Sequence, residues 1–341
     1  MKKSLMTLGV LALFVLMAYG QEKKFALYSV AFYNMENLFD TIHDEGKNDY
    51  EYLPNGTNQR NTMKYKAKLK NMSEILSLLS TDKLPMGPAI IGVSEIENYR
   101  VLEDILKQPA LADRGYQYVH YEGEDQRGVD CAFFYNPKLF ELTNSKLVPY
   151  VYINDTVHKT RGFLIASGNI AGEKMHFIVN HWPSRAAASP ARERAGEQVR
   201  AIKDSLLRED SAAKIVIMGD MNDDPMDKSM AVALGAKRKP VDAGPTDLYN
   251  PWWDTLKKGY GTLMYKGKWN LFDQIVFTGN LLGTDRITLK FYKHEIFSRD
   301  FMFQKEGKYK GYPKRTQAGG VWLNGYSDHL PTIIYLIKEV K

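Results

Sequence analysis

Residues 215–225, with the sequence IVIMGDMNDDP, constrain the fold of this chain more than any other stretch. Four apolar, β-prone residues lead to a glycine, and the turn that follows carries four oxygen-bearing side chains, those of Asp220, Asn222, Asp223 and Asp224. A buried strand therefore ends in polar side chains, and a strand end is where a rigid scaffold can hold such groups accurately beside solvent. Taken alone, a cluster of this kind is more often an ordinary polar turn. Its meaning depends on what the rest of the chain supplies.

The first twenty residues have the pattern of a secretory signal peptide. Two lysines precede an apolar run at residues 5–17, and small residues near Gly20 offer a cleavage site. The apolar run is too short for a stable membrane span, and no later stretch approaches spanning length. We therefore expect an exported protein, periplasmic or secreted. Its mature chain, residues 21–341, contains no linker or repeat and is expected to form a single domain.

Cysteine content and charge set two further limits. The only cysteine is Cys131, so no disulfide can form within the chain and an exported protein must rely on core packing. The formal net charge is +6, and removing Lys2 and Lys3 with the signal peptide leaves +4. This mild excess is compatible with an anionic partner. No protein partner can be inferred, and we expect a monomer.

Strand-like and helical patterns alternate along the mature chain. Runs of β-branched and aromatic residues predict strands at 25–34, 89–93, 116–121, 129–135, 140–150, 162–166, 175–180, 270–277 and 332–337. Apolar residues at helical spacing predict helices at 66–79, 99–107, 189–209 and 227–234. Ser189 is expected to cap the third helix, with Pro190 at its first position. Several strand pairs are too closely connected for helical crossovers, which favours mixed sheets over a doubly wound parallel sheet.

Side chains of catalytic type recur at the strand ends. Five apolar strands border such residues and a sixth apolar run contains one; together they supply Asn34, Glu36, Glu95, His181, Asp220, Asn222, Asp273, Asp328 and His329. Each residue alone has an ordinary structural explanation. Their recurrence at six strands is hard to attribute to chance and predicts one site.

Seven motifs resemble those of the endonuclease/exonuclease/phosphatase superfamily, whose members are deoxyribonuclease I-like, and they stand in the order that superfamily uses. They are YNMEN, GVSEIEN, RGVD, VNHWPSR, GDMNDDP, FDQI and SDHLP, and the resemblance spans about residues 29–337. The combination of SEIEN with VNHWPSR is most similar to the secreted bacterial nuclease branch. The resemblance implies a four-layer α/β sandwich, two packed mixed β-sheets flanked by helices, with the site at one end.

The resemblance also implies a metal centre. Glu95 matches the principal metal carboxylate of the family, and three further positions match residues on or beside the metal, namely Asn34, Glu36 and Asp328. Oxygen ligands of this kind suit Mg²⁺ or Mn²⁺, with Ca²⁺ as an alternative. Glu36 stands where other members carry Asp or a different residue, and this longer side chain leaves one metal or two open.

By the same resemblance, a second group would carry out phosphodiester cleavage. Asp220 would orient and deprotonate the attacking water, and Asn222 would hold that water or a phosphate oxygen. His181 and His329 would donate hydrogen bonds and transfer protons, and Asp273 would pair with the histidine of SDHLP. The division between general base and general acid stays open.

Two further assignments near these catalytic residues are left with alternatives. Arg127 matches a substrate-side arginine that could grip a phosphate, although an arginine at the protein surface is a competing interpretation. The carboxylate partner of His181 is not fixed, and Glu97 and Glu103 are the candidates.

The expected activity is therefore metal-dependent hydrolysis of a phosphoric ester by in-line attack of an activated water. Nucleic acid, DNA or RNA, is the first choice of substrate, and the protein would be an endonuclease by resemblance. The loop KEGKYKGYPKR at 305–315 can meet phosphates and stack on bases, although a solvated loop explains it equally well. A sphingomyelinase- or inositol-phosphatase-like enzyme is the alternative, without a convincing apolar hairpin for membrane docking. A non-catalytic phosphate or nucleic-acid binder would not need both Asp220 and His329.

Overall fold

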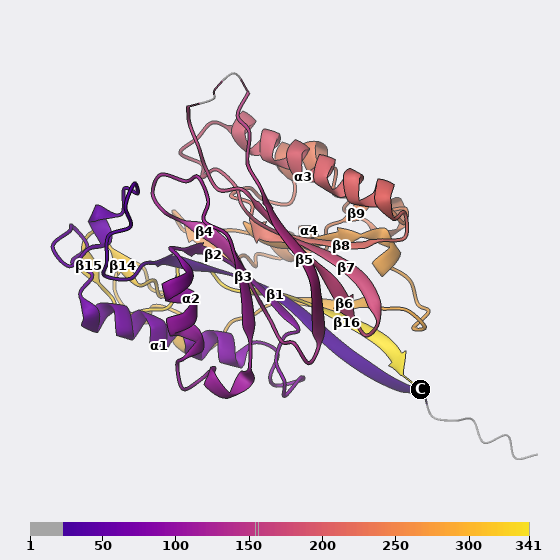
Figure 1. The fold of residues 1–341 in the computed structure, drawn as a ribbon, viewed down its shortest axis with the longest axis horizontal. Helices are drawn as coiled ribbons and strands as arrows, with labels where there is room; N and C mark the ends of the chain where they lie inside the picture. Colours follow the sequence, from indigo (N-terminus) through magenta and orange to yellow (C-terminus); the bar gives the residue numbers. More distant parts are fainter. Residues whose placement is uncertain (1–22, 154, 156, 341) are drawn as a thin grey trace, which may run out of the picture.

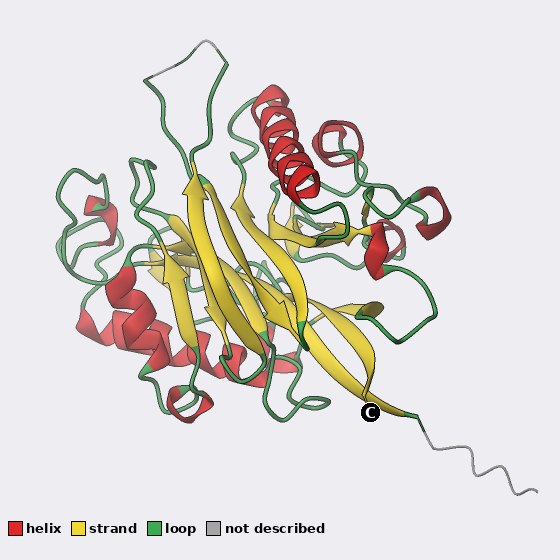
Figure 2. Cartoon of the chain, turned by 45° about the vertical axis from the view of Figure 1, so that its right-hand side comes forward, coloured by secondary structure: helices red, strands yellow, loops and turns green. Residues whose placement is uncertain are grey.

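Two six-stranded β-sheets packed together form the centre of the molecule, and helices cover both outer faces (Figure 1, Figure 2). The structure is a computed structural model that describes residues 23–340 except 154 and 156; the predicted signal peptide, 1–20, lies outside these residues. The expected four-layer α/β sandwich with two mixed sheets is confirmed. Among the described residues, no helix is long and apolar enough to cross a membrane.

The first sheet combines the beginning and the end of the chain. Its strand order is β13-β16-β1-β2-β4-β3, and only β1 and β2 are parallel neighbours. The bounds are β1 Lys24–Leu38, β2 Ile90–Ile96, β3 Gln117–His120, β4 Asp130–Tyr135, β13 Lys290–Ile296 and β16 Thr332–Val340. Helices α1 (Thr62–Leu78) and α2 (Tyr99–Leu106) pack apolar faces against this sheet, as their helical spacing predicts.

The second sheet is built from the middle of the chain. Its order is β5-β6-β7-β8-β12-β9, and β7 and β8 are its parallel pair. The bounds are β5 Phe140–Val148, β6 Phe163–Ile170, β7 Glu173–His181, β8 Lys214–Asp220, β9 Leu248–Tyr249 and β12 Asp273–Thr278. The long helix α3 (Ser189–Glu209) makes the crossover between β7 and β8, as a parallel connection requires, and packs on the outer face.

Short elements complete the described chain. They are helix α4 (Trp253–Lys257), the hairpins β10 (Leu263–Tyr265) with β11 (Lys268–Asn270) and β14 (Gln317–Ala318) with β15 (Val321–Trp322), a π-helix at Ser229–Leu234, and 3₁₀ turns at Tyr50–Tyr52, Ala112–Arg114, Pro240–Asp242, Gly279–Leu281 and Asp300–Met302. Both hairpins lie at the end of the sandwich where the site is found.

The main core lies between the two sheets, where β1 and β2 face β7 and β8. The backbone of the first sheet comes unusually close at Gly92, because a Cβ atom there would meet Met218 Sδ at 2.6 Å and Val179 Cγ1 at 3.2 Å. Gly92, Val179 and Met218 are all buried. The glycine therefore permits close contact between the sheets, which fixes one side of the site relative to the other.

Three local expectations differ from the structure. Ser189 is the first residue of α3 and not its cap; Ala188 flanks the helix and the Ser189 hydroxyl lies 3.2 Å from Glu193 Oε1. The helix expected at 227–234 is the π-helix Ser229–Leu234. The strand expected at 270–277 is interrupted, because the Leu271 N–H donates to Asp224 Oδ1 at 2.7 Å instead of to a neighbouring strand.

Candidate active site

Side chains from both sheets meet at one end of the sandwich. Parallel strands end at the same edge, so β7 and β8 place His181 directly beside Asp220 in the sheet register. Strand β12 runs antiparallel to β8 and begins there, with Asp273 opposite Asp220. In the first sheet, β1 pairs Asn34 with Ser94 of β2 just before Glu95. The strand-end motifs are thus brought together as the sequence predicts.

Backbone irregularities aim several of these side chains. The registers of β1 with β2 and of β2 with β4 both shift here, after residues 34 and 94. Within the shifts, Glu36 has φ 46°, Asn37 has φ 53° and Glu95 has φ 58°; in the second sheet Asn222 has φ 51°. Left-handed backbone costs a glutamate about 1 kcal/mol, and such conformations concentrate at functional sites. The bulges turn side chains that would alternate between sheet faces toward the site.

Asn34 connects the two sheets through side-chain hydrogen bonds. Asn34 Nδ2 donates to Glu95 Oε1 at 3.1 Å and to Asp220 Oδ2 at 3.0 Å, and its Oδ1 accepts the Glu36 N–H at 2.8 Å. The second oxygen of Glu95 accepts the Asn37 N–H at 3.0 Å. Asn34 is fully buried and Asp220 nearly so, whereas the Glu95 side chain is 16 % exposed. The Glu95 carboxylate therefore faces the open part of the site.

Two histidines approach Asp220 from different sides. His181 Nε2 lies 3.7 Å from Asp220 Oδ2 and 3.6 Å from Glu95 Oε1. His329 Nε2 lies 3.8 Å from Asp220 Oδ2, and its Nδ1 lies 2.7 Å from Asp273 Oδ2. The expected pairing of Asp273 with the histidine of SDHLP is present, and it directs Nε2 of that histidine toward the site.

The suggested carboxylate partners of His181 are wrong. Its Nδ1 atom is buried and has no hydrogen-bond partner among the described residues. Glu97 instead accepts the Asp40 N–H at 2.7 Å, and Glu103 of α2 lies with Oε2 3.2 Å from Lys107 Nζ.

The charges of this centre differ from those of free side chains. Burial raises the pKa of Asp220 to about 7, with further contributions from Asp273 and Glu95. Burial opposes the charged form of His329, but Asp273 and Asp220 outweigh it and raise the pKa of this imidazole well above its usual value. Burial, together with the positive charges of Arg161 and Arg127, lowers the pKa of His181 well below its usual value. At neutral pH His329 is a charged donor and His181 a neutral imidazole.

Asn222 and Arg127 lie at the edge of the centre. Asn222 Nδ2 donates to the Trp182 carbonyl at 3.0 Å, and its N–H donates to Asp220 Oδ1 at 2.9 Å, so Asn222 orients the Asp220 carboxylate. The Arg127 side chain is half exposed, with Nε 3.6 Å from Asp125 Oδ1. Its charge reaches His181, which is consistent with a position at the rim.

A buried arginine near His181 was not predicted. Arg161 Nη1 donates to Asp125 Oδ2 at 3.0 Å and Arg161 Nη2 donates to the Trp182 carbonyl at 2.9 Å. It thereby fixes the backbone that follows His181. The sequence offers only an arginine before a strand, which gives no sign that the side chain is buried.

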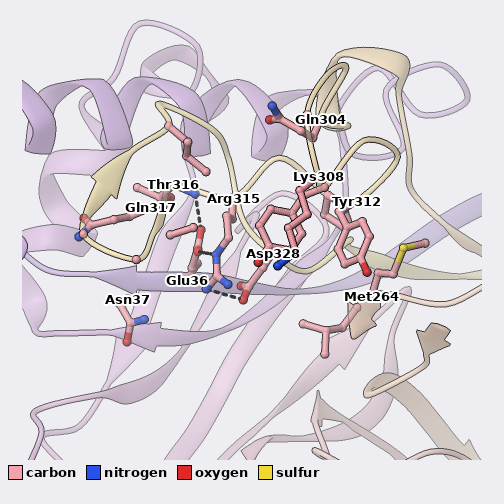
Figure 3. Close-up of a pocket in the computed structure, with 18 of the residues that line it drawn as sticks. Glu36, Asn37, Met264, Gln304, Lys308, Tyr312, Arg315, Thr316, Gln317 and Asp328 are labelled. Carbon is pink, nitrogen blue, oxygen red and sulfur yellow. Dashed lines mark hydrogen bonds and ion pairs between the residues drawn. The ribbon is translucent and has the colours of Figure 1, made fainter. Parts of the chain in front are cut away.

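Glu36 and Asp328, two of the predicted metal-binding residues, hold an arginine between them (Figure 3). Arg315 Nε donates to Glu36 Oε1 at 2.9 Å, and Arg315 Nη2 lies 2.9 Å from Asp328 Oδ2. The other Glu36 oxygen accepts the Thr316 N–H at 2.6 Å. Both Glu36 oxygens are therefore engaged, and the guanidinium is a fixed positive charge beside the centre.

A fully buried lysine next to Glu36 binds the loop that carries Arg315 and Thr316. Lys68 of α1 donates from Nζ to Thr316 Oγ1 at 2.5 Å and to the Tyr326 carbonyl at 2.6 Å, and lies 3.9 Å from Glu36 Oε2. This lysine was not predicted, because within its helical pattern it resembles any surface lysine. It connects α1 to the loop that carries Arg315.

We expect Lys68→Met to lower the free energy of unfolding by about 3 kcal/mol, because it removes the buried hydrogen bonds of Lys68 to Thr316 and Tyr326 and leaves Glu36 with Arg315 as its remaining cationic partner. Urea unfolding followed by circular dichroism measures the change. Lys66→Met, at an exposed position of the same helix, is the matched control and should change stability by less than about 0.5 kcal/mol. Equal effects of the two substitutions would contradict the role given to Lys68.

The donor atoms fit a hard divalent cation. Ligand atoms of Glu95, His181 and Asp220 lie within 4.8 Å of one another, carboxylate oxygens dominate, and Glu95 opens toward solvent. Such a set suits Mg²⁺ or Mn²⁺, which retain waters and share phosphate oxygens. Glu95 is the residue best placed to hold the ion. Metal roles for Asn34, Glu36 and Asp328 stay predictions. Here the Asn34 side chain binds Glu95, Asp220 and the Glu36 N–H, and the Glu36 and Asp328 side chains bind Arg315.

A cavity of about 910 Å³ opens beside the centre. Glu36, Asn37, Asp328 and Arg315 form its inner end (Figure 3), and its walls come from the 3₁₀ turn near Tyr52, the β10–β11 hairpin and residues 304–323. Part of the basic, aromatic loop noted in the sequence lines this cavity, although residues 305–311 are all exposed to solvent. Its size is that of sites for small organic ligands.

Known proteins share this architecture. The sequence model of the Endonuclease/Exonuclease/phosphatase family matches residues 29–338, while no curated protein sequence matches the chain. D. rerio TDP2 complexed with a single-strand DNA product is 15 % identical, with a TM-score of 0.53 over 91 % of this chain and 99 % of that one. The mannosyl-6-phosphatase of Bacteroides thetaiotaomicron is 15 % identical, with a TM-score of 0.56 over 91 % and 99 %.

The human nocturnin catalytic domain is a third similar structure, with 15 % identity and a TM-score of 0.53 over 93 % of this chain and 98 % of that one. At such identities the structural likeness shows the fold alone. The family model, in contrast, spans nearly all of the described sequence, including every strand-end motif that meets in the site. The chain therefore belongs to the endonuclease/exonuclease/phosphatase family, whose members hydrolyse phosphoric esters.

Proposed function

We propose that this protein is an exported, metal-dependent phosphodiesterase that cleaves nucleic acid. One observation carries the proposal: Asp220 is held between Glu95, linked to it through Asn34, and a charged His329 paired with Asp273. A carboxylate with a pKa near 7, a cation-binding carboxylate and a charged imidazole are the groups that hydrolysis of a phosphodiester requires.

The residues divide the work by their charge. A divalent ion, when bound at Glu95, would neutralise charge on the phosphoryl oxygens. Asp220 accepts the proton of the attacking water, and the Asn222 N–H holds this carboxylate in place. His329 donates from Nε2 to a phosphate oxygen, and its charge is sustained by Asp273. The neutral imidazole of His181, which also lies near Asp220, donates one hydrogen bond from Nε2 to the phosphate.

Nucleic acid is favoured over other esters by the cavity beside the centre. Tyrosines and positive side chains line it, and these are the groups that stack on bases and contact phosphates. Among structures of the same fold, TDP2 was observed with a single-strand DNA product. The export pattern at residues 1–20 supports a role on nucleic acid outside the cytoplasm. N-terminal sequencing of the mature protein tests export and should begin near Gln21.

A lipid phosphodiesterase is the second candidate, and one feature favours it. The described residues between β5 and β6 extend from the sandwich (Figure 1), and among them Val151, Ile153 and Val157 are 56, 66 and 76 % exposed. It returns to the sheet at Arg161, next to the site. Exposed apolar side chains at such a position are suited to contact with a lipid surface.

The test is hydrolysis by the mature protein, residues 21–341, of single-stranded and duplex DNA, RNA, sphingomyelin vesicles and phosphoinositides, each with Mg²⁺ or Mn²⁺. We expect cleavage of nucleic acid that stops when EDTA removes the ion and returns when Mg²⁺ is added in excess. Activity on lipids alone would replace the nuclease proposal by the second candidate. Tight binding without any cleavage would indicate a binding protein.

A further inference from the structure

The cavity beside the centre is lined by four tyrosines, Tyr52, Tyr265, Tyr309 and Tyr312; we call it the tyrosine pocket. Tyr265 is 62 % exposed and Tyr309 is 48 % exposed, so their rings are available to a ligand. Tyr52 stacks on Phe39 at 4.1 Å between ring centroids and is fixed from behind. Aromatic faces therefore come from three separate segments around one space.

The pocket is held in shape without a ligand. The Tyr312 hydroxyl accepts the Gly267 N–H at 2.6 Å, which joins the outer wall to the β10–β11 hairpin. Within that wall, Gln304 and Tyr312 pair through the backbone at 2.8 Å, and Lys68 fixes the far end at Thr316. A ligand would meet ordered walls and lose little binding free energy to their ordering.

Four positive side chains and three carboxylates line the pocket, and two of the carboxylates, Glu36 and Asp328, are already paired with Arg315. Lys308 Nζ lies 5.5 Å from the Tyr309 ring centroid and Lys266 Nζ lies 5.2 Å from that of Tyr265. Deeper in the pocket, Arg60 is 2 % exposed, lies 5.3 Å from the Tyr52 centroid and has a buried Nε without a partner among the described residues. Arg315 stands at the inner end, where the pocket meets the centre. The pocket thus offers tyrosine rings with positive side chains beside them to an anionic ligand that carries a flat ring.

We propose that the tyrosine pocket binds the base and sugar of one unpaired nucleotide next to the phosphate that is cleaved. This inference rests on the proposed nuclease function and names its substrate class, single-stranded nucleic acid or an unpaired end. The volume of about 910 Å³ lies within the range of sites that enclose a small organic ligand. A base stacked and paired within a duplex has no free face for a tyrosine, so pairing and entry into the pocket exclude each other.

The experiment compares cleavage of a single-stranded oligonucleotide, its duplex, and a single strand that lacks one base next to the scissile phosphate. The proteins are wild type, Tyr309→Ala, Tyr312→Phe and Tyr312→Ala, with Tyr292→Ala as control. Tyr292 is 53 % exposed on β13 and does not line the pocket. Thermal unfolding checks that each variant is folded, and fluorescence anisotropy in EDTA measures binding apart from cleavage.

We expect wild type to prefer the single strand at least tenfold, and Tyr309→Ala and Tyr312→Ala to raise KM and Kd about tenfold with kcat changed less than threefold. Tyr312→Phe keeps the ring and should retain most of the affinity. Loss of the base should raise the KM and Kd of wild type by a similar factor, and it should raise those of the alanine variants little further. Equal cleavage of single strand and duplex, with unchanged variants, would overturn the pocket assignment alone. Absence of any nucleic-acid cleavage would overturn the proposed function and the pocket assignment with it.

Discussion

Asp220→Asn is expected to lower turnover at least a hundredfold while leaving the fold intact. The amide cannot accept the proton of the attacking water, and removal of a general base typically costs a factor of this size. Asp220 is 1 % exposed and receives hydrogen bonds from Asn34 and from the Asn222 backbone; the isosteric amide retains the packing and one of these two hydrogen bonds. Steady-state kinetics with Mg²⁺ measures the loss. Asp227→Asn, a more exposed aspartate in the same turn that pairs with Arg185, is the matched control.

The pH profile provides an independent test of this role. Because the pKa of Asp220 is raised to about 7, the carboxyl group acquires the charge of a base only as pH rises through this value. A cation bound at Glu95 favours the carboxylate and moves the midpoint lower. We therefore expect kcat/KM to rise with pH to a plateau, with a midpoint at or below 7, and this rise to be absent from Asp220→Asn. Turnover near the wild-type level in that variant would assign the base elsewhere.

His329→Ala is expected to lower turnover about a hundredfold or more, since it removes the charged donor of the centre. Asp273 acts through this histidine by a 2.7 Å contact, so Asp273→Asn should also reduce activity. Because the two residues work as a unit, the double variant should be no worse than His329→Ala alone. His158→Ala, at a largely exposed histidine, is the control. Additive losses in the double variant would show that Asp273 acts independently of His329.

Much of this centre could be predicted because its signals are local. A strand pattern and the polar residues at its end are adjacent in sequence, so Asp220, His181 and Glu95 could each be placed at a strand end. The common edge then followed from the architecture that the motif set implies. Even the pairing of Asp273 with His329 was predictable, because each residue lies in a recognisable motif.

The parts that escaped prediction depend on contacts between distant residues. Arg315 and Glu36 are 279 positions apart, and nothing near either residue indicates their ion pair. Lys68 fits an exposed helical position in pattern but is fully buried by a loop 248 residues away. The tyrosine pocket is assembled from three such segments, so its enclosed shape has no counterpart in the linear sequence. The difference at Ser189 is smaller: α3 begins one residue earlier than predicted, so Ser189 is its first residue and not its cap.

The position of β16 affects when the enzyme can become active. This strand is the last one described, yet it lies between β13 and β1, and it pairs Val340 with Lys24. The first sheet therefore cannot be completed until the chain has been synthesised through β16, and His329 arrives only just before that strand. Pairings of such long sequence separation form slowly. A chain that has not yet been synthesised through residue 329 would thus lack the charged donor beside Asp220 and carry an incomplete centre.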